Sequence, residues 1–284
     1  MGIDIKRICS KIIQDNFDRI AQYSIQLFHN DRPCWEQSPP EPIGTGVLII
    51  YENRYFIVSA AHVLQPYATR QKRNPYREDS EYDDPQEAFL SLKNIGFYYD
   101  KHYYPIKEVA YTNITGEVEN LIDIAVIKLE TETVKELSGK QFVDNNWMEF
   151  NHVITTQNRY FVYGYPAEWT DLKSTEIVQK PLEMITNGID ALTVEGVKFD
   201  AQYNLLIGYD PKSLVDKDGN VLNISSPNGI SGCGLWYLGT GSQLKLVGIM
   251  TENKIVKESM PFMMATRIDT VIDILKIILQ KSSV

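Results

Sequence analysis

The stretch from Ser225 to Trp236, SSPNGISGCGLW, places Ser231 at the apex of a turn, with Gly229 two residues before it and Gly232 directly after it. Glycine lets a backbone fold tightly, in conformations that a Cβ atom obstructs. Such a turn exposes the Ser231 hydroxyl and aims the N–H groups of Gly229 and Ser231 at one point. A hydroxyl beside two converging N–H donors is the arrangement of a nucleophile next to an oxyanion hole. Turns of glycine and serine are common, so an ordinary turn is the alternative interpretation of this stretch alone.

Two residues far upstream complete a set that does chemistry. His62 follows an apolar run over residues 54–60, and Asp123 begins the run DIAVIKL. An imidazole takes the proton of a serine hydroxyl, and a carboxylate fixes its tautomer and stabilises the imidazolium. Taken singly, a histidine after a strand is more often a structural polar group, and an aspartate at a strand entrance is usually a turn residue. Together with Ser231, they predict a Ser–His–Asp hydrolase.

The elements that must position these side chains are mostly strands. Residues 44–51 and 54–60 predict a β-hairpin around the polar turn Glu52-Asn53. Amphipathic spacing predicts a helix over residues 3–17 and another over 268–279. Residues 130–152 are a predicted connector, and the charged residues 70–88 a predicted insertion or mobile flap. Many short strands at close spacing favour β-barrels or sandwiches. Further strands are expected over residues 23–28, 97–99, 107–111, 124–129, 160–163, 191–194, 203–207, 235–238 and 244–250.

Six short motifs carry a resemblance to a known family: GTG at residues 44–46, SAAHV at 59–63, DIAV at 123–126, GYP at 164–166, GISG at 229–232 and LVGI at 246–249. They resemble the trypsin-like serine peptidases, particularly the disulfide-free bacterial members, over roughly residues 20–280. The resemblance implies an all-β fold of two six-stranded antiparallel β-barrels, to which this chain adds an N-terminal and a C-terminal helix. The expected parts are a helical extension over residues 1–18, a first barrel over 19–150 with His62 and Asp123, and a second barrel over 151–284 with Ser231 and the C-terminal helix.

The serine turn departs from the family pattern in two ways. The family usually has Ser-Gly-Gly-Pro, whereas this chain has Ser231-Gly232-Cys233-Gly234. Cys233 is expected to pack as a small apolar residue, with a cysteine nucleophile as the alternative. Secreted members place an aspartate just before the serine, where it receives a newly cut N-terminus. Ile230 stands there in this chain, so that activation switch is expected to be missing and the N-terminal helix need not be removed.

The resemblance also indicates a substrate pocket. Ser225 lies six residues before the nucleophile, where tryptic enzymes place an acid that binds basic side chains. Thr251, Glu252 and Asn253 fall along the expected pocket wall, with Met263 near its base. A neutral, partly filled pocket favours a small or medium apolar P1 side chain over Lys or Arg. The Glu252 carboxylate acts against this preference, because it attracts a basic group nearby.

Several other kinds of site are disfavoured. An α/β-hydrolase has its histidine after the serine, but all four histidines precede Ser231. A zinc peptidase would need an HExxH motif or paired Cys/His spacing, and neither occurs. Asp216, Asp218 and Asn220 begin like a calcium loop, but Pro227 stands where the twelfth-position glutamate belongs. We therefore expect no cofactor and no metal.

The composition disfavours several classes of binding partner and indicates a cellular location. The 284 residues are 43% hydrophobic and carry a net charge of −9, which disfavours attraction to nucleic acid or to an anionic membrane surface. No apolar run approaches the length of a membrane span, and the first residues lack a secretory pattern. Three scattered cysteines favour a reducing compartment, and a cytoplasmic location is expected.

The combined prediction is a cofactor-free serine endopeptidase that cuts one or few protein or peptide substrates and is gated by a regulatory protein partner. A broadly active protease would be hazardous in the cytoplasm, which is the reason to expect gating. The alternative from another class is a protease-like binding module or scaffold whose triad is unproductive. An esterase on the same fold is a third interpretation.

Overall fold

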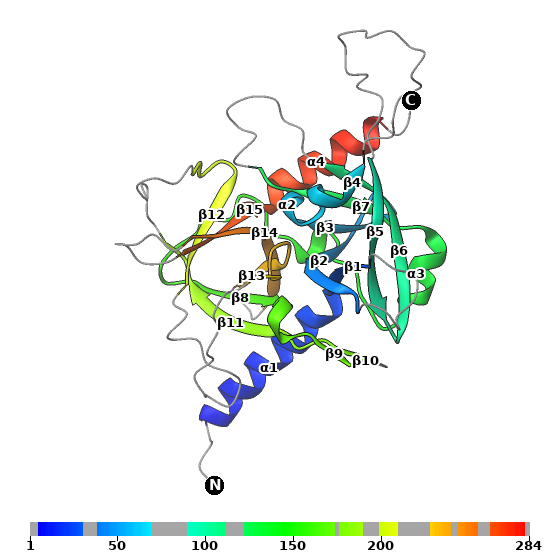
Figure 1. Ribbon diagram of the computed structural model, residues 1–284. Coiled ribbons are helices and arrows are strands. Elements are labelled where there is room, and N and C mark those ends of the chain that lie inside the picture. Colours follow the sequence, from blue (N-terminus) through cyan, green and yellow to red (C-terminus); the bar gives the residue numbers. More distant parts are fainter. Residues whose placement is uncertain are drawn as a thin grey trace, which may run out of the picture.

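The structure is a computed structural model that describes residues 5–30, 39–69, 90–111, 122–173, 176–189, 199–209, 228–239, 243–254 and 262–281. Two large antiparallel sheets lie side by side, with a long helix near each end of the chain (Figure 1), and Asp171–Lys173 and Glu176–Val178 form a separate two-stranded sheet. The elements are α1 (Ile5–Tyr23), β1 (Ser24–His29), β2 (Glu41–Tyr51), β3 (Arg54–Ser59), α2 (Ala61–Leu64), η1 (Gln65–Tyr67), β4 (Ala68–Thr69), β5 (Leu90–Tyr99), β6 (His102–Tyr111), β7 (Ala125–Lys128), α3 (Thr131–Glu136), η2 (Asn145–Trp147), β8 (Arg159–Gly164), η3 (Ala167–Trp169), β9 (Asp171–Lys173), β10 (Glu176–Val178), β11 (Leu182–Asn187), β12 (Asn204–Gly208), β13 (Gly234–Leu238), β14 (Leu244–Lys254), β15 (Phe262–Arg267) and α4 (Ile268–Lys281).

The first sheet closes into a barrel. Its strands follow the order β1-β2-β3-β7-β6-β5, and β1 pairs back onto β5 through Leu27 and Phe97, while the short β4 adds to the outer edge of β5. The predicted hairpin is confirmed: β2 and β3 are joined by Glu52 and Asn53, whose φ angles of 48° and 58° suit a tight hairpin turn. The interior is filled by apolar side chains from alternate strand positions: Ile25, Leu27, Leu48, Ile57, Phe97, Ile106 and Ile127.

The second sheet curls in the same manner but closes less completely. Its order is β11-β8-β13-β14-β15-β12, and its two edge strands meet at a single bridge between Gly188 and Ile207. Its interior holds Val162, Leu182, Leu205, Ile207, Cys233, Leu235, Val247 and Met263. The strand predicted over residues 191–194 lies outside the described residues.

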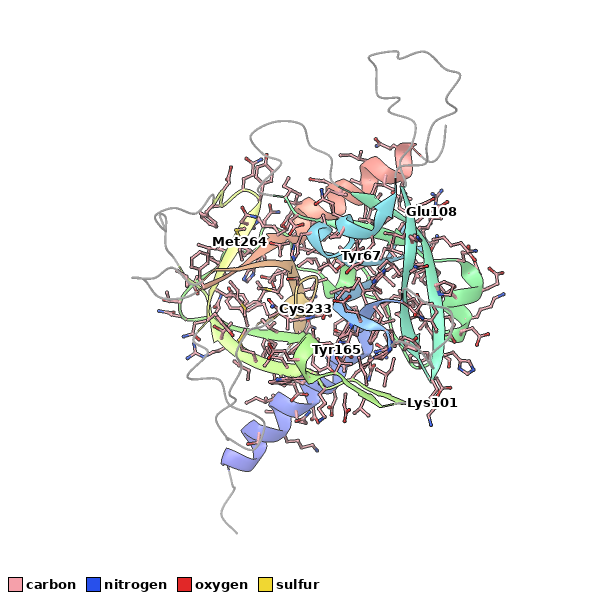
Figure 2. The ribbon with its side chains drawn as sticks, viewed as in Figure 1. Tyr67, Lys101, Glu108, Tyr165, Cys233 and Met264 are labelled. Carbon is pink, nitrogen blue, oxygen red and sulfur yellow. The ribbon has the colours of Figure 1, made fainter. Side chains whose placement is uncertain are left out.

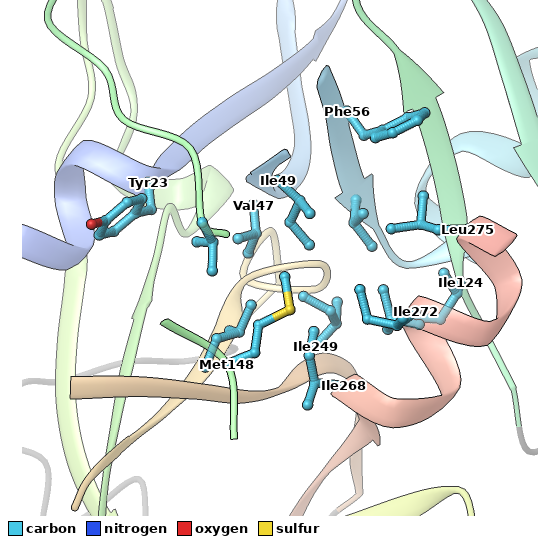
Figure 3. Close-up of a cluster of buried hydrophobic side chains, with 14 of the residues drawn as sticks. Tyr23, Val47, Ile49, Phe56, Ile124, Met148, Ile249, Ile268, Ile272 and Leu275 are labelled. Carbon is cyan, nitrogen blue, oxygen red and sulfur yellow. The ribbon is translucent and has the colours of Figure 1, made fainter. Parts of the chain in front are cut away.

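A third apolar cluster lies between the two sheets (Figure 3). Val47 and Phe56 of the first sheet meet Ile249 of the second, and Ile272 and Leu275 of α4 complete the cluster. All five side chains are at most 5% exposed. Burying one such side chain stabilises the fold by about 1.5–3 kcal/mol, so this shared core holds the two sheets together.

Helix α1 belongs to the same interface, as its amphipathic pattern predicted. Phe17 packs edge-on against Phe161 of β8 with ring centroids 5.3 Å apart, and Tyr23 lies 5.4 Å from Trp236 of β13. The helix runs to Tyr23, beyond the predicted end at residue 17. Partly buried Lys140 stabilises the helix end, because its ammonium donates to the carbonyls of Ala21 (2.9 Å) and Ser24 (2.6 Å).

The architecture is therefore all-β with one helix near each end: a closed six-stranded antiparallel barrel beside a curled six-stranded sheet. This is consistent with the double-barrel fold of the chymotrypsin-like proteins. The predicted domain boundaries after residues 18 and 150 stay predictions. In the described part of the chain, no helix combines the length and hydropathy needed to cross a membrane.

Candidate active site

His62 and Asp123 are joined by two hydrogen bonds at the edge of the first barrel. The Nδ1 atom of His62 lies 2.5 Å from Oδ2 of Asp123. The backbone N–H of His62 donates to the other carboxylate oxygen, Oδ1, at 2.9 Å. With Nδ1–H donating to the carboxylate, the imidazole presents Nε2 as its basic nitrogen. One carboxylate therefore fixes both the backbone and the ring of the same histidine.

The sheet register explains this meeting. Ser59 of β3 pairs with Ala125 of β7, so continuing the antiparallel register brings Ala61 opposite Asp123. The short helix α2 begins at Ala61, and its first N–H groups need acceptors outside the helix. Asp123 supplies both, since its carbonyl accepts from Ala61 (3.3 Å) and its side chain from His62. The aspartate is thus placed by pairing of the strands and by the helix start.

The Ser231 turn, from the second barrel, lies against the same edge of the first barrel. The backbone N–H of Thr45 on β2 donates to the Ser231 carbonyl at 2.9 Å. Next to it, Gly232 has a φ of +89°, and a Cβ atom there would lie 2.1 Å from both the Ser59 hydroxyl and the Thr45 carbonyl. The same Cβ would lie 3.0 Å from the N atom of Ala60, two residues before the histidine. Only glycine fits this contact between the barrels.

Gly44 is the second close contact. A Cβ atom at Gly44 would lie 2.5 Å from a methyl group of Val63, the residue after the histidine, and 3.3 Å from the Ser231 carbonyl oxygen. The histidine segment and the serine turn therefore approach Gly44 together. The structure brings all three predicted residues to one boundary.

The peptide groups around Ser231 have fixed orientations, because every carbonyl from residue 228 to 231 accepts a hydrogen bond. The pairs are Ala167 N to Asn228 O (2.8 Å), Thr45 Oγ1 to Gly229 O (2.9 Å), Cys233 N to Ile230 O (3.0 Å) and Thr45 N to Ser231 O (2.9 Å). In a trans peptide the N–H points away from the carbonyl, and the described residues contain no cis peptide bond. The N–H groups of Gly229 and Ser231 therefore point away from Ala167 and Cys233.

The site is open enough for chemistry. The His62 side chain is 50% exposed and the Asp123 side chain 30% exposed. Cys233, by contrast, is fully buried in the core of the second barrel, and burial raises the pKa of its thiol far above the ordinary value. A buried thiol held in its neutral form is a poor nucleophile. The expectation that Cys233 packs as a small apolar residue is confirmed, and Figure 2 labels its place within the fold.

Ile230 anchors the turn through apolar contact. Its side chain is 3% exposed and lies against Gly164 at the end of β8, where an added Cβ atom would come within 2.9 Å of the Ile230 Cβ. The turn is thus held by burial at the position where the family's secreted members have a charged residue. The described structure contains no group of three or more Asp, Glu, His or Cys side chains arranged to hold a metal ion.

The structure describes some of the predicted pocket residues and not others. Thr251, in β14, is 2% exposed, and Met263, in β15, is fully buried in the second-barrel core. The backbones of Glu252 and Asn253 continue β14 and pair with Met264 and Met263 of β15. Ser225 lies outside the described residues, as do the loop over 70–88 and the segment from Asp216 to Asn220. The pocket itself stays a prediction.

No protein-family model matches the sequence. A search of the curated proteins likewise finds no match. The likeness to the trypsin-like peptidases therefore depends on the motifs and on the double-barrel architecture.

Sequence reasoning overlooked two residues that organise the site, Thr45 and Ser59. Both are fully buried and polar, and the Ser59 hydroxyl donates to the Thr45 carbonyl at 2.7 Å. Both stood within the quoted motifs, but no role was assigned to either. The available signal was a hydroxyl between two glycines at the start of an apolar strand, because a buried polar side chain must find a partner.

Proposed function

We propose that this chain is a serine endopeptidase of the trypsin-like type, with Ser231 as nucleophile, His62 as general base and Asp123 as the carboxylate that holds the imidazole. One observation carries the proposal. The His62–Asp123 pair and the Ser231 turn, which are far apart in the sequence, meet at the boundary between the barrels, and the carbonyls of the turn are directed away toward other donors.

The proposed reaction has two halves. The Ser231 oxygen attacks the peptide carbonyl carbon while Nε2 of His62 takes the hydroxyl proton, and the resulting oxyanion is bound by the N–H groups of Gly229 and Ser231. The carbon–nitrogen bond then breaks, and the imidazolium returns its proton to the leaving amine. In the second half, water takes the place of the serine hydroxyl, and hydrolysis of the acyl-enzyme restores Ser231. Asp123 stays ionised throughout and stabilises the imidazolium.

The edge of β14 supports a peptide as the substrate. The strand pairs with β13 as far as Ile249, opposite Gly234, whereas Glu252 to Lys254 pair only with β15 among the described residues. On the side that faces β13, this segment of β14 extends beyond Gly234, the first residue of β13, and past the serine turn that precedes it. An extended peptide that adds to such an edge gains backbone hydrogen bonds and brings its scissile bond toward Ser231. Thr251 and Met263 line the predicted P1 side, which favours a small or medium apolar side chain.

A fluorophosphonate probe, which reacts with activated serines, tests the proposal directly. We expect covalent labelling of the full chain at Ser231, with Ser231→Ala and His62→Ala unlabelled. A control is Ser24→Ala, because the Ser24 hydroxyl is buried and bonds to the Ile20 carbonyl at the end of α1, away from the proposed site. Peptide-library cleavage then separates an endopeptidase from an esterase, which turns over esters but not peptides. Labelling that persists in Ser231→Ala would refute the assignment of the nucleophile.

A second candidate function is a protease-like binding module. The observation that favours it is the altered Ser-Gly-Cys-Gly turn around the proposed nucleophile. Lack of labelling of the folded wild-type protein, alone and with candidate partners, would favour the module.

Partner gating and a cytoplasmic location remain predictions. The loop over 70–88 and the N-terminal helix are the candidate gates or docking surfaces. The loop lies outside the described residues, and α1 packs on the second barrel through Phe17. Deleting residues 1–16 keeps that contact and removes most of the helix. Unchanged partner binding and unchanged hydrolysis after this deletion would remove α1 from a gating role.

A further inference from the structure

Thr45 makes more contacts to the serine turn than any strand pairing requires. It lies on β2 of the first barrel and is fully buried. Its hydroxyl donates to the Gly229 carbonyl at 2.9 Å and accepts from the N–H of Tyr165 at 3.0 Å. Its backbone N–H donates to the Ser231 carbonyl at 2.9 Å, and its carbonyl accepts from the Ser59 hydroxyl. One first-barrel residue thus bonds to three residues of the second barrel, two of which carry the proposed oxyanion donors.

The Thr45 hydroxyl bonds to a glycine whose backbone has a positive φ angle. Gly229 has a φ of +99°, in the region that glycine populates as readily as its mirror image. A glycine can reorient its peptide groups at little steric cost, so the direction of its carbonyl depends on an external donor. Thr45 Oγ1 is that donor for the Gly229 carbonyl. The segment after β8 holds the same turn from its other side. Tyr165 N–H donates to the Thr45 hydroxyl, and Ala167 N–H donates to the Asn228 carbonyl.

We propose that Thr45 is a positioning residue for the oxyanion site: its hydroxyl holds the Gly229 carbonyl toward the first barrel and so fixes the turn that directs the Gly229 and Ser231 N–H groups. This role rests on the proposed function. Thr45 touches neither substrate nor the reacting atoms and acts through Gly229. It also makes the site a joint product of the two barrels, since the donor comes from one and the turn from the other.

The experiment compares two substitutions of the full chain. Thr45→Val keeps the volume and removes the hydroxyl, which leaves the Gly229 carbonyl and the Tyr165 N–H buried without a partner. Thr45→Ser keeps the hydroxyl. Loss of one oxyanion donor lowers kcat by about 10²–10³-fold, and misplacing the donors is a smaller change. We therefore expect a fall of roughly 10- to 100-fold in kcat for p-nitrophenyl acetate and in fluorophosphonate labelling rate for the valine variant.

Two further readouts separate positioning from general damage. We expect KM to change by less than about twofold and the pH midpoint of the reaction to stay unchanged, because the His62–Asp123 pair is untouched. Thr45→Ser should restore the rate to within about threefold of wild type. The matched control is Thr266→Val, because the buried Thr266 hydroxyl has no hydrogen-bond partner in the described structure. This variant should react like wild type.

The outcomes distinguish this role from the function on which it rests. A wild-type protein that is not labelled at Ser231 overturns the proposed function and this role together. A labelled wild type whose folded Thr45→Val variant reacts at the same rate overturns the role of Thr45 alone. If the valine variant does not fold, Thr45→Ala takes its place with the same expected loss. If both fail to fold, the hydroxyl is needed for the structure itself and the positioning role is overturned.

Discussion

Two histidines in this molecule each bond to a carboxylate, and their surroundings differ in every other respect. His62 meets Asp123 with its side chain 50% exposed, at the boundary with the Ser231 turn. His152 meets Glu149 at 2.7 Å with its side chain 3% exposed, and its second nitrogen lies 2.9 Å from the Tyr160 hydroxyl. The ring of Tyr237 packs against His152 as well, with centroids 4.6 Å apart.

The difference shows what makes a histidine–carboxylate pair suitable for catalysis. In the buried pair both ring nitrogens are bound by protein groups, so proton transfer to a substrate is blocked and the imidazole serves as a linker. In the exposed pair Asp123 binds Nδ1, and the His62 side chain is half exposed. Residue type is the same in both places, and burial together with the second partner decides the role.

The largest expected effect separates the two carboxylates. Asp123→Asn should lower Ser231 labelling and peptide hydrolysis by about 10³–10⁴-fold, because the amide no longer holds the productive tautomer or stabilises the imidazolium. Glu149→Gln should leave the rate per folded molecule unchanged. Steady-state kinetics on both variants measures the contrast, and an equal loss in the two would end the distinction between the pairs.

The buried pair should matter for stability instead. His152→Phe removes both side-chain hydrogen bonds of the histidine, which leaves Glu149 without this partner and the Tyr160 hydroxyl with the longer 3.5 Å bond from Asn158. We therefore expect a loss of about 2–4 kcal/mol in the free energy of unfolding. Urea unfolding monitored by tryptophan fluorescence measures this. The folded fraction should label at Ser231 at the wild-type rate. A tenfold slower labelling at full folding would instead make His152 part of the active site.

Lys140 extends the comparison of exposed and enclosed ionisable groups from the histidines to a lysine. Burial lowers its pKa to about 8, whereas the unfolded chain keeps it near 10.4. Between these values the unfolded state binds the extra proton, so stability rises with pH and is lost as pH falls from about 10 to 8. Desolvation causes this lowering of the pKa, and we expect the stability of wild type relative to Lys140→Met to increase by roughly 2 kcal/mol from pH 8 to pH 10.

The free energy of unfolding is measured for wild type and for Lys140→Met from about pH 8 to pH 10. The difference between the two isolates the contribution of Lys140, since the other groups titrate alike in both proteins. A stability difference that stays constant over this range would mean that Lys140 keeps its proton in the folded protein.

The smallest effect concerns Cys233, two residues from the proposed nucleophile. Cys233→Ala should cost about 1 kcal/mol of stability through lost packing and should leave labelling at Ser231 within about twofold. Iodoacetamide should modify the Cys233 thiol only after denaturation, because it is fully buried. Mass spectrometry of native and unfolded protein checks this, and rapid native modification at Cys233 would reopen the cysteine-nucleophile alternative.

The parts of the fold that could be predicted are those set by local pattern. The hairpin around Glu52-Asn53 and the helix α4 follow from turn chemistry and from apolar spacing. Strand β6 was predicted too short, at residues 107–111, because Pro105 lies inside it. Proline discourages a strand assignment, but here it stands opposite Gly96, where the barrel tolerates it.

In the candidate site, too, local relations could be predicted from the sequence, and contacts between the two barrels could not. His62 and Asp123 were predicted to meet, and the structure joins them by two hydrogen bonds. Their relation to Ser231 depended on motif resemblance, because nothing local in the sequence predicts how two barrels face each other. The Thr45–Gly229 hydrogen bond could not be predicted, since it joins positions 184 residues apart and depends on a close approach of two backbones. Likewise, the His152–Tyr160 contact needed the curvature of the second sheet.

Helix α1 has a consequence for how the protein is made. Phe17 and Tyr23 leave the ribosome first, but the rings that cover them, Phe161 and Trp236, emerge only when most of the chain has been synthesised. The first barrel closes through its own strands and can form early, while one face of this helix stays exposed to chaperones. Docking of α1 therefore marks the completion of the second half, and a truncated nascent chain displays an apolar surface that quality control can recognise.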